Sequence, residues 1–436
     1  MNIGGCTCID PDSLYRNMTK EYSMNYTKTE QRLIEAMESM TIVDAHEHLP
    51  PEHVRTGLKV DVLTLFAHYT RTDLITSGMN PDDYNTVIDS EKPLDERWKM
   101  FKPYFEHIRY ASYTRPALMA VKEFYGFDEI NDSNYSAISE KMQAENTPGI
   151  YKRVMRDKCK IRVALTQAGR TDYDDDLLVP LMPIDVYASV RSADDVKQKA
   201  SNLGMEAKTL DDYMAVTKKG IEKWKSEGAV GVKMMSRPNI VPSKKIAEEI
   251  FNKIMIGDKP NVTIGQDDHL TDYMANYIMD VVGELDMVMA VHAGMWGDFR
   301  YLDSKHNITI FPRHPNTRFD LYHLGMPSVR DTIVIGKNHP NVWLNLCWCH
   351  IISQQMTISG LDECIDMVPI NKIIGFGGDY SRPVEKIYGH LAMAREDIAT
   401  VLGRRVDRGQ MSVDEAIVIA KKWLWDNPKN LYKLDI

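Results

Sequence analysis

The chain has little cysteine, no long apolar run and no excess of positive charge, and each absence argues against a class of protein. Six cysteines among 436 residues are too few for a disulfide scaffold. Because no stretch of about 18 consecutive apolar residues occurs, no transmembrane helix is expected. A net charge of −9 leaves no overall basic field to attract nucleic acid or an anionic membrane.

The N-terminal residues and the paired cysteines show no specialised signal either. Residues 1–17 lack the basic region and apolar stretch of a secretory signal, so a cytoplasmic protein is expected. The pairs Cys6/Cys8 and Cys347/Cys349 do not have the spacing of a zinc site, and a structural role is favoured over a metal role. With 43% hydrophobic and 26% charged residues, the composition is that of a soluble globular protein.

The pattern from about residue 160 onward indicates an α/β fold. Short apolar runs rich in β-branched residues alternate with longer amphipathic stretches, as in βαβ units with a parallel sheet. Eight such runs predict a (β/α)8 TIM barrel, a fold that often exceeds about 250 residues through loop insertions. The expected strands are 42–45, 161–165, 178–181, 229–233, 287–291, 318–322, 342–346 and 372–376.

The first two expected strands are separated by a segment far too long for an ordinary loop. Residues 50–158 have helical patterns and follow the carboxyl end of a strand, so they should form a helical cap over the active site. We therefore expect an N-terminal segment, 1–40, and one barrel, 41–436, that includes the cap. Residues 412–432 are predicted to form a helix at the bottom of the barrel. The aromatic residues of the cap are expected to pack, namely Trp98, Phe101, Tyr104, Phe105 and Tyr110.

The strongest local signal is His46-Glu47-His48 at the end of the first expected strand. Residues two apart on a strand point to the same side, so both imidazoles can converge on one ion at the barrel mouth. Paired histidines at a strand end can also be ordinary polar loop residues. The motif gains weight because later strands end in residues of a similar type.

Three later strands end in such residues. His292 in VHAG and His323 in YHLG each follow an apolar run, where an imidazole without a partner is unfavourable. A buried, hydrogen-bonded core histidine is the alternative for either one. Asp379 follows the glycine-rich run GFGG, and a buried carboxylate there needs a cation or a good set of hydrogen bonds. Its alternative role is that of a helix N-cap.

The order HxH, His, His, Asp, each at a strand end, resembles the amidohydrolase superfamily. The motifs VHAG, YHLG and GFGGD, with NVWLNLCWCHIIS between the last two, are similar to the branch that includes aminocarboxymuconate semialdehyde decarboxylase and several lactonases. The match runs from about residue 160 to the C-terminus and includes the first strand. The motifs HEHLPPE and WKMFKPYFEHIRY also resemble, more faintly, the uronate isomerases, which share the barrel and its metal site.

The resemblance implies a set of ligands and roles. His46, His48 and His292 would be neutral imidazole ligands and Asp379 the carboxylate ligand of one divalent metal. Zinc is the expected ion, and manganese or iron would also fit. Asp379 would take the proton of a metal-activated water, and His323 would orient that water or polarise the substrate carbonyl. Some superfamily members carry a carboxylated lysine between two metals at the position of Lys233, but a single metal is favoured and Lys233 is assigned to substrate binding.

Further residues are expected to line the substrate pocket. Three arginines could bind a substrate carboxylate through a two-pronged contact, although each is individually more typical of a surface or structural residue. Three residues just past strand ends could line the pocket, with packing as the equal alternative. The arginines are Arg109, Arg237 and Arg382, and the strand-end residues are Trp296, Trp348 and His350.

These observations favour a metal-dependent hydrolase acting on an amide, ester or lactone bond of a small substrate, with or without a carboxylate, through a metal-activated water. The alternative is a non-hydrolytic metal-dependent decarboxylase or a uronate isomerase-like enzyme. A catalytically inactive binding barrel is disfavoured because no expected ligand is missing. The expected partner is a small molecule, not nucleic acid or a membrane, and self-association into a homo-oligomer fits a barrel with helical insertions.

Overall fold

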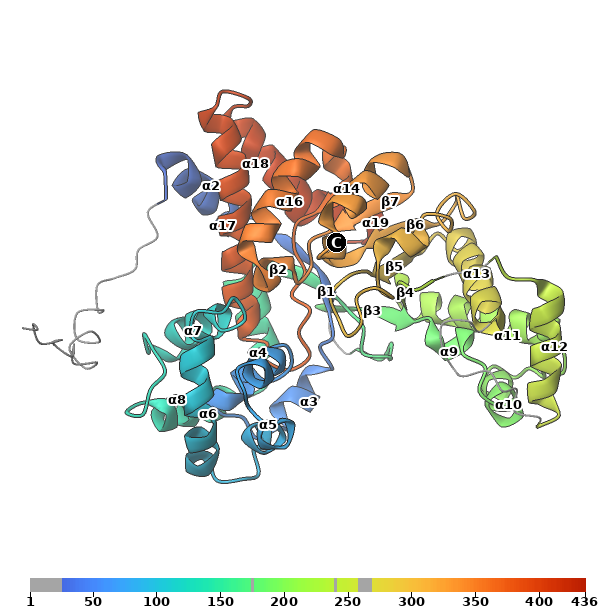
Figure 1. Cartoon of the computed structure of the whole chain (residues 1–436), viewed down its shortest axis with the longest axis horizontal. Coiled ribbons are helices and arrows are strands. Elements are labelled where there is room, and N and C mark those ends of the chain that lie inside the picture. The colour runs from blue at the N-terminus through green and yellow to red at the C-terminus, as the bar shows by residue number, and fades with distance from the viewer. Residues whose placement is uncertain (1–25, 174–175, 239–240, 258–268) are drawn as a thin grey trace, which may run out of the picture.

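The computed structural model describes residues 26–173, 176–238, 241–257 and 269–436. Eight parallel strands in chain order form one sheet, and helices surround it (Figure 1). The predicted (β/α)8 barrel is therefore confirmed. The interpretation of Cys6 and Cys8 falls outside the described residues.

Each of the eight expected strands is present, with small shifts at the ends. The apolar runs become strands because both of their faces are covered, one by the barrel interior and the other by the surrounding helices. The strands are β1 (Ile42–Glu47), β2 (Ile161–Thr166), β3 (Leu178–Pro183), β4 (Gly231–Met235), β5 (Val288–His292), β6 (Arg318–Leu321), β7 (Val342–Asn345) and β8 (Ile373–Ile374).

The barrel closes through the segment that follows the short strand β8. The Asp379 amide donates to the His46 carbonyl at 2.8 Å, and the His48 amide donates to the Tyr380 carbonyl at 2.9 Å. The segment that carries Asp379 is thus bonded directly to the strand that carries His46 and His48. This closure places the first and last candidate ligands of the chain side by side.

Helices cover the outside of the barrel. The helix α11, for example, begins at a capping box formed by Thr209 and Asp212 and buries an apolar face. The N-terminal helix α2 (Lys28–Ser39) packs against α17 and α18. The helices between β3 and β8 are α9 (Asp185–Ala188), α10 (Ala193–Ser201), α11 (Leu210–Ser226), α12 (Lys244–Met255), α13 (His269–Glu284), η4 (Ser304–Asn307), η5 (Tyr322–Gly325), α14 (Val329–Asn338), α15 (Cys349–Ile352), α16 (Gln354–Met367) and η6 (Ile370–Lys372). The long helix α17 (Lys386–Asp407) follows β8.

The residues between β1 and β2 form a separate group of helices, at the lower left of Figure 1. We call this group the cap. It has its own apolar core, in which Trp98, Phe101 and Phe105 are buried, whereas Tyr110 is 82% exposed. The cap consists of α3 (Glu52–Thr56), η1 (Val62–Phe66), α4 (Thr70–Thr76), α5 (Pro81–Ile88), α6 (Leu94–Ile108), α7 (Arg115–Ala120), η2 (Val121–Tyr125), α8 (Tyr135–Glu145) and η3 (Lys152–Lys158).

The C-terminal residues, predicted as one helix, form three consecutive helical pieces. These are α18 (Val413–Lys421), η7 (Lys422–Asp426) and α19 (Asn427–Tyr432). Tyr432 packs with Val43 and Ile374 in the barrel interior, and its hydroxyl donates to Asp320 Oδ2 at 2.6 Å. This end of the chain therefore fills the barrel from the side opposite the HxH motif.

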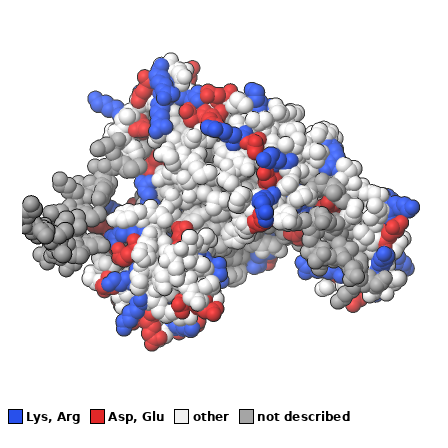
Figure 2. Space-filling model, viewed as in Figure 1, with Lys and Arg blue, Asp and Glu red and all other residues white. Residues whose placement is uncertain are grey.

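The surface and the helices agree with the absences noted in the sequence. Charged side chains of both signs are interspersed over the face shown in Figure 2, without a continuous basic surface on that face. Among the described residues, no helix is both long enough and apolar enough to cross a membrane.

Candidate metal centre

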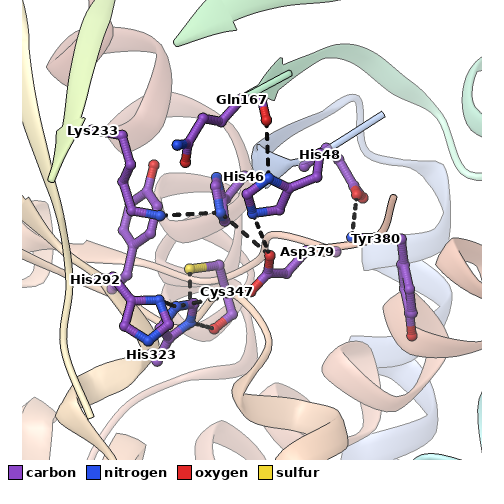
Figure 3. A network of polar contacts seen from close by, with 12 residues as sticks. His46, His48, Gln167, Lys233, His292, His323, Cys347, Asp379 and Tyr380 are labelled. Atoms are coloured by element: carbon purple, nitrogen blue, oxygen red, sulfur yellow. Dashed lines mark hydrogen bonds and ion pairs between the residues drawn. The ribbon is translucent and has the colours of Figure 1, made fainter. Parts of the chain in front are cut away.

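His46, His48 and Asp379 converge at the carboxyl ends of the strands (Figure 3). The Nε2 atoms of His46 and His48 lie 3.3 and 3.2 Å from Asp379 Oδ1. The two histidines meet because residues two apart on β1 share a face, and Asp379 joins them through the closure of the barrel. One donor atom from each residue lies within 4.8 Å of the others, which is close enough for a single ion.

His46, His48 and Asp379 have nitrogen and oxygen lone pairs that no hydrogen bond uses and that could bind a cation. His48 Nδ1 lies 2.9 Å from the Gln167 carbonyl, which can only accept, so Nδ1 carries the proton of the neutral ring. Its Nε2 lone pair then faces an oxygen of Asp379, and such a contact is favourable when a metal ion lies between the two. Among the described residues, His46 Nδ1 and Asp379 Oδ1 are buried without a hydrogen-bond partner. Nitrogen and oxygen donors of this kind fit zinc, manganese or iron.

The charges of the three residues are those that metal ligands require. Burial alone would raise the pKa of Asp379, but the imidazoles of His46 and His48 hold this pKa well below its usual range. Burial, together with the charge of Lys233, lowers the pKa of His46. At neutral pH the site therefore presents an ionised carboxylate beside a neutral imidazole.

Two buried carboxyl groups that sequence reasoning missed hold the backbone around Asp379. Asp44 Oδ1 accepts from the Gly378 amide at 3.1 Å, and Glu47 Oε2 accepts from the Tyr380 amide at 2.6 Å. Burial raises the pKa of both groups, that of Asp44 to about 6. A side chain at Gly378 would collide with the Glu47 carboxyl, which explains the glycine before Asp379. The signal in the sequence was the alternation of acidic residues with histidines in one buried strand.

His292 and His323 contact each other through two ring nitrogens that both lack a proton. His323 Nδ1 lies 3.0 Å from the Cys347 carbonyl, and His292 Nε2 lies 3.0 Å from the Met295 carbonyl. Both carbonyls accept, so each neutral ring donates outward, and the two nitrogens that face each other at 2.9 Å both present lone pairs. Burial lowers the pKa of both rings, that of His292 to about 3, so a third proton is absent at neutral pH. Another partner for His292 would relieve this contact.

His292 lies outside the group of three residues around Asp379. Its role as a fourth ligand stays a prediction. His323 Nε2 lies 3.8 Å from Asp379 Oδ2, next to the predicted ligands, and its role toward the substrate or water stays a prediction.

Lys233 stands at the same rim. It is buried, its Nζ lies 3.3 Å from His46 Nε2, and it lies over the Tyr322 ring at 4.4 Å from the ring centroid. Burial lowers the pKa of its ammonium group. The lysine therefore approaches the predicted ligands from β4, while its role in substrate binding stays a prediction.

Two of the three predicted arginines are already paired. Arg109 bonds to Glu129 at 3.1 Å within the cap, and Arg237 forms an ion pair with buried Asp272. Arg382 is exposed and forms no ion pair with any residue that the structure describes. Of the three guanidinium groups, that of Arg382 is therefore the one with charge available for a substrate carboxylate.

His350, in α15 after β7, is fully buried and packs in the interior, which is the expected alternative to lining the pocket. Its Nδ1 lies 2.8 Å from Asp397 Oδ2, and its Nε2 lies 2.9 Å from the Gly375 carbonyl. Both ring nitrogens are therefore engaged, and neither is free for a substrate. The contact with Gly375 supports the backbone just before Asp379.

The cap contributes two residues near Asp379 that sequence reasoning missed. Burial and the negative charge of Asp379 raise the pKa of Tyr69. Burial lowers the pKa of His68 to about 4, and the charge of Asp379 opposes that shift. Neither residue follows a strand, so no spacing rule pointed to them.

A family model described as amidohydrolase matches residues 192–434, more than half of the 436 residues. The chain belongs to the amidohydrolase family. It therefore has the fold of the metal-dependent amidohydrolase superfamily, which agrees with the resemblance carried by VHAG, YHLG and GFGGD. No curated protein sequence matches the chain.

Solved structures are similar over nearly the whole chain, including the cap. A uronate isomerase from Thermotoga maritima is 17% identical, with a TM-score of 0.76 over 93% of this chain and 98% of that one. A glucuronate isomerase from Caulobacter crescentus is 16% identical, with a TM-score of 0.77 over 94% of each chain. A candidate metal-dependent hydrolase from Lactobacillus casei is 14% identical, with a TM-score of 0.61 over 92% of this chain and 97% of that one. At these identities the similarity concerns the fold.

Proposed function

We propose that this protein is a metal-dependent hydrolase that cleaves an amide, ester or lactone bond of a small substrate. The observation that supports this most strongly is the convergence of two imidazole nitrogens on the ionised carboxylate of Asp379 at the mouth of the barrel. Active sites of (β/α)8 enzymes lie at this end of the strands. His46, His48 and Asp379 would hold one divalent cation there, with His292 as the predicted fourth ligand.

The roles of the protein groups follow from their positions. A divalent cation bound there would supply Lewis acidity, which acidifies a water molecule and polarises a carbonyl oxygen. Asp379 is ionised and buried, so it can take the proton of the attacking water. His323 Nε2, 3.8 Å from Asp379 Oδ2, presents a lone pair that would orient the attacking water, and Asp379 would return the proton to the leaving group. Lys233, beside His46, would bind an oxygen of the substrate.

A uronate isomerase-like reaction is the second candidate. The observation that favours it is the similarity to two isomerase structures over more than nine-tenths of this chain, cap included. A uronate carries a carboxylate, yet Arg109 and Arg237 are paired with Glu129 and Asp272. Arg382 keeps its charge available for such a carboxylate, so the arginines do not separate hydrolysis from isomerisation of a uronate.

Product analysis in water labelled with oxygen-18 distinguishes hydrolysis from isomerisation of a uronate. Zinc- or manganese-loaded protein is incubated with a panel of small amides, esters, lactones and uronates, and products are followed by NMR and mass spectrometry. Hydrolysis is expected to place one solvent oxygen in the product carboxylate. Conversion of a uronate to an isomer of equal composition, with no cleavage of any amide, ester or lactone, would refute the hydrolase proposal. Asp379→Asn serves as the inactive control.

A further inference from the structure

Four aromatic rings from distant parts of the chain meet beside the candidate metal centre. Tyr69 and Tyr113 come from the cap, Trp296 follows β5 and Trp348 follows β7; we call these four residues the mouth cluster. The Tyr69 and Trp348 rings stack with centroids 4.3 Å apart, and the Tyr113 ring is nearly parallel to that of Trp348 at 6.3 Å. The Trp296 ring stands edge-on to the rings of Tyr69 and Trp348, at 5.9 and 6.4 Å.

The mouth cluster is continuous with the residues assigned to chemistry. The Trp348 ring lies 5.2 Å from the His323 ring, and the charge of Asp379 acts on Tyr69. From there the rings lead outward to Trp296, which is 53% exposed. The other three rings are buried, so a flat group would be placed against Trp296, at the outer end of a cluster that reaches the predicted metal ligands.

The backbone around these rings is strained. Trp348 has φ 65°, Trp296 has φ 153°, and His68, whose ring lies 3.9 Å from that of Tyr69, has φ 68°. Residues other than glycine in such conformations cost on the order of 1–3 kcal/mol each and cluster at functional sites. Exposure of a large apolar ring adds a further cost. Folding stability does not account for a strained and exposed Trp296, whereas ligand binding does.

We propose that the mouth cluster is a stacking site for a flat, unsaturated ring attached to the bond that the enzyme cleaves. Aromatic side chains pair with such rings in offset or edge-on arrangements. This assignment of substrate class rests on the proposed hydrolase function and adds that aryl or unsaturated cyclic substrates are preferred over saturated ones of equal size.

The test uses three hydroxamates, which chelate a divalent metal but differ in the attached group. Isothermal titration calorimetry on the zinc-loaded protein compares acetohydroxamate, benzohydroxamate and cyclohexanecarbohydroxamate. The aryl compound is expected to bind roughly 2- to 10-fold more tightly than the cyclohexyl compound. Trp296→Ala should abolish this difference, Trp296→Phe should keep most of it, and Tyr110→Ala, at an exposed ring of the cap, should leave it unchanged.

The outcomes separate this proposal from the proposed function. If acetohydroxamate binds only in the presence of zinc but the aryl compound has no advantage, the stacking proposal fails and the metal centre stands. If no hydroxamate binds in a zinc-dependent way, the metal centre itself fails. If Trp296→Ala keeps the aryl preference but dissociates an oligomer in size-exclusion chromatography, the exposed ring belongs to an interface between copies of the chain, and the stacking proposal is overturned. Circular dichroism of each variant verifies its folding.

Discussion

The mouth cluster and the core of the cap are both built from closely spaced rings, yet they differ in how the chain holds them. In the cap, Phe66, Phe101 and Phe105 have centroids 4.7 to 5.4 Å apart and are fully buried, with Phe101 and Phe105 one turn apart on α6. The mouth cluster comes from loops, and two of its four residues have positive φ. Three rings of the mouth cluster are buried as well, and Trp296 alone of the four is exposed. Periodic, buried rings stabilise a fold, whereas a strained ring that reaches the surface beside polar residues indicates a binding site.

The largest expected effect comes from a change of Asp379, the carboxylate beside the mouth cluster. Asp379→Asn removes the charge that His46 and His48 face, so bound zinc should be lost and turnover should fall on the order of 10²–10⁴-fold or more. Elemental analysis and steady-state kinetics measure both. The matched control is Asp320→Asn, because Asp320 is buried in the same barrel beside Tyr432. Full zinc occupancy in Asp379→Asn would contradict the assigned site.

His323→Ala should separate metal binding from turnover. Its Nε2 lies 3.8 Å from Asp379 Oδ2, so its loss removes the group that would orient the attacking water but not a predicted ligand. We expect zinc content near that of the wild type and a loss of turnover on the order of 10²-fold. The pH profile of turnover should change shape as well. Loss of zinc in proportion to turnover would show that His323 holds the metal instead.

Phe101→Ala tests the cap core against the mouth cluster. Removing this fully buried ring should lower the free energy of unfolding by about 3–5 kcal/mol, as for other buried phenylalanines. Zinc content and the preference for benzohydroxamate should not change in the folded variant. Urea unfolding and calorimetry provide the two measurements. The comparison between the two clusters breaks down if Trp296→Ala costs as much stability as Phe101→Ala.

The smallest expected effect concerns Lys386, the first residue of α17, which is buried against the cap. Burial lowers its pKa to about 7, and Asp73 opposes that shift. Between pH 7 and the unfolded value of about 10.4, the unfolded chain binds more protons than the folded chain, so this lysine makes stability rise with pH. Lys386→Met should therefore gain most relative to the wild type near pH 6 and least near pH 10.

Urea unfolding at the two pH values measures this difference. The exposed Lys99→Met variant, on α6, is the control and should show no such trend. A difference between Lys386→Met and wild type that stays constant from pH 6 to pH 10 would show that burial does not shift this lysine.

Much of the barrel and part of the site could be predicted because each depends on local pattern. Apolar runs specify strands, and polar residues at the ends of parallel strands share one rim by geometry. That is why His46, His48 and Asp379 were found, although the last lies more than three hundred residues from the first two. The eight strands were located by the same reasoning.

What tertiary structure alone decided were the contacts between elements that no short-range pattern relates. The folding of the cap brought Tyr69 and His68 to Asp379, and it paired Arg109 with Glu129. Long-range packing likewise buried His350 against Asp397. A side chain's partner depends on which surfaces meet in three dimensions, and its position in a periodic pattern specifies only which face it occupies. The sequence alone thus determined the barrel and the rim where a metal can bind, and the meeting of cap and barrel decided which side chains surround that rim.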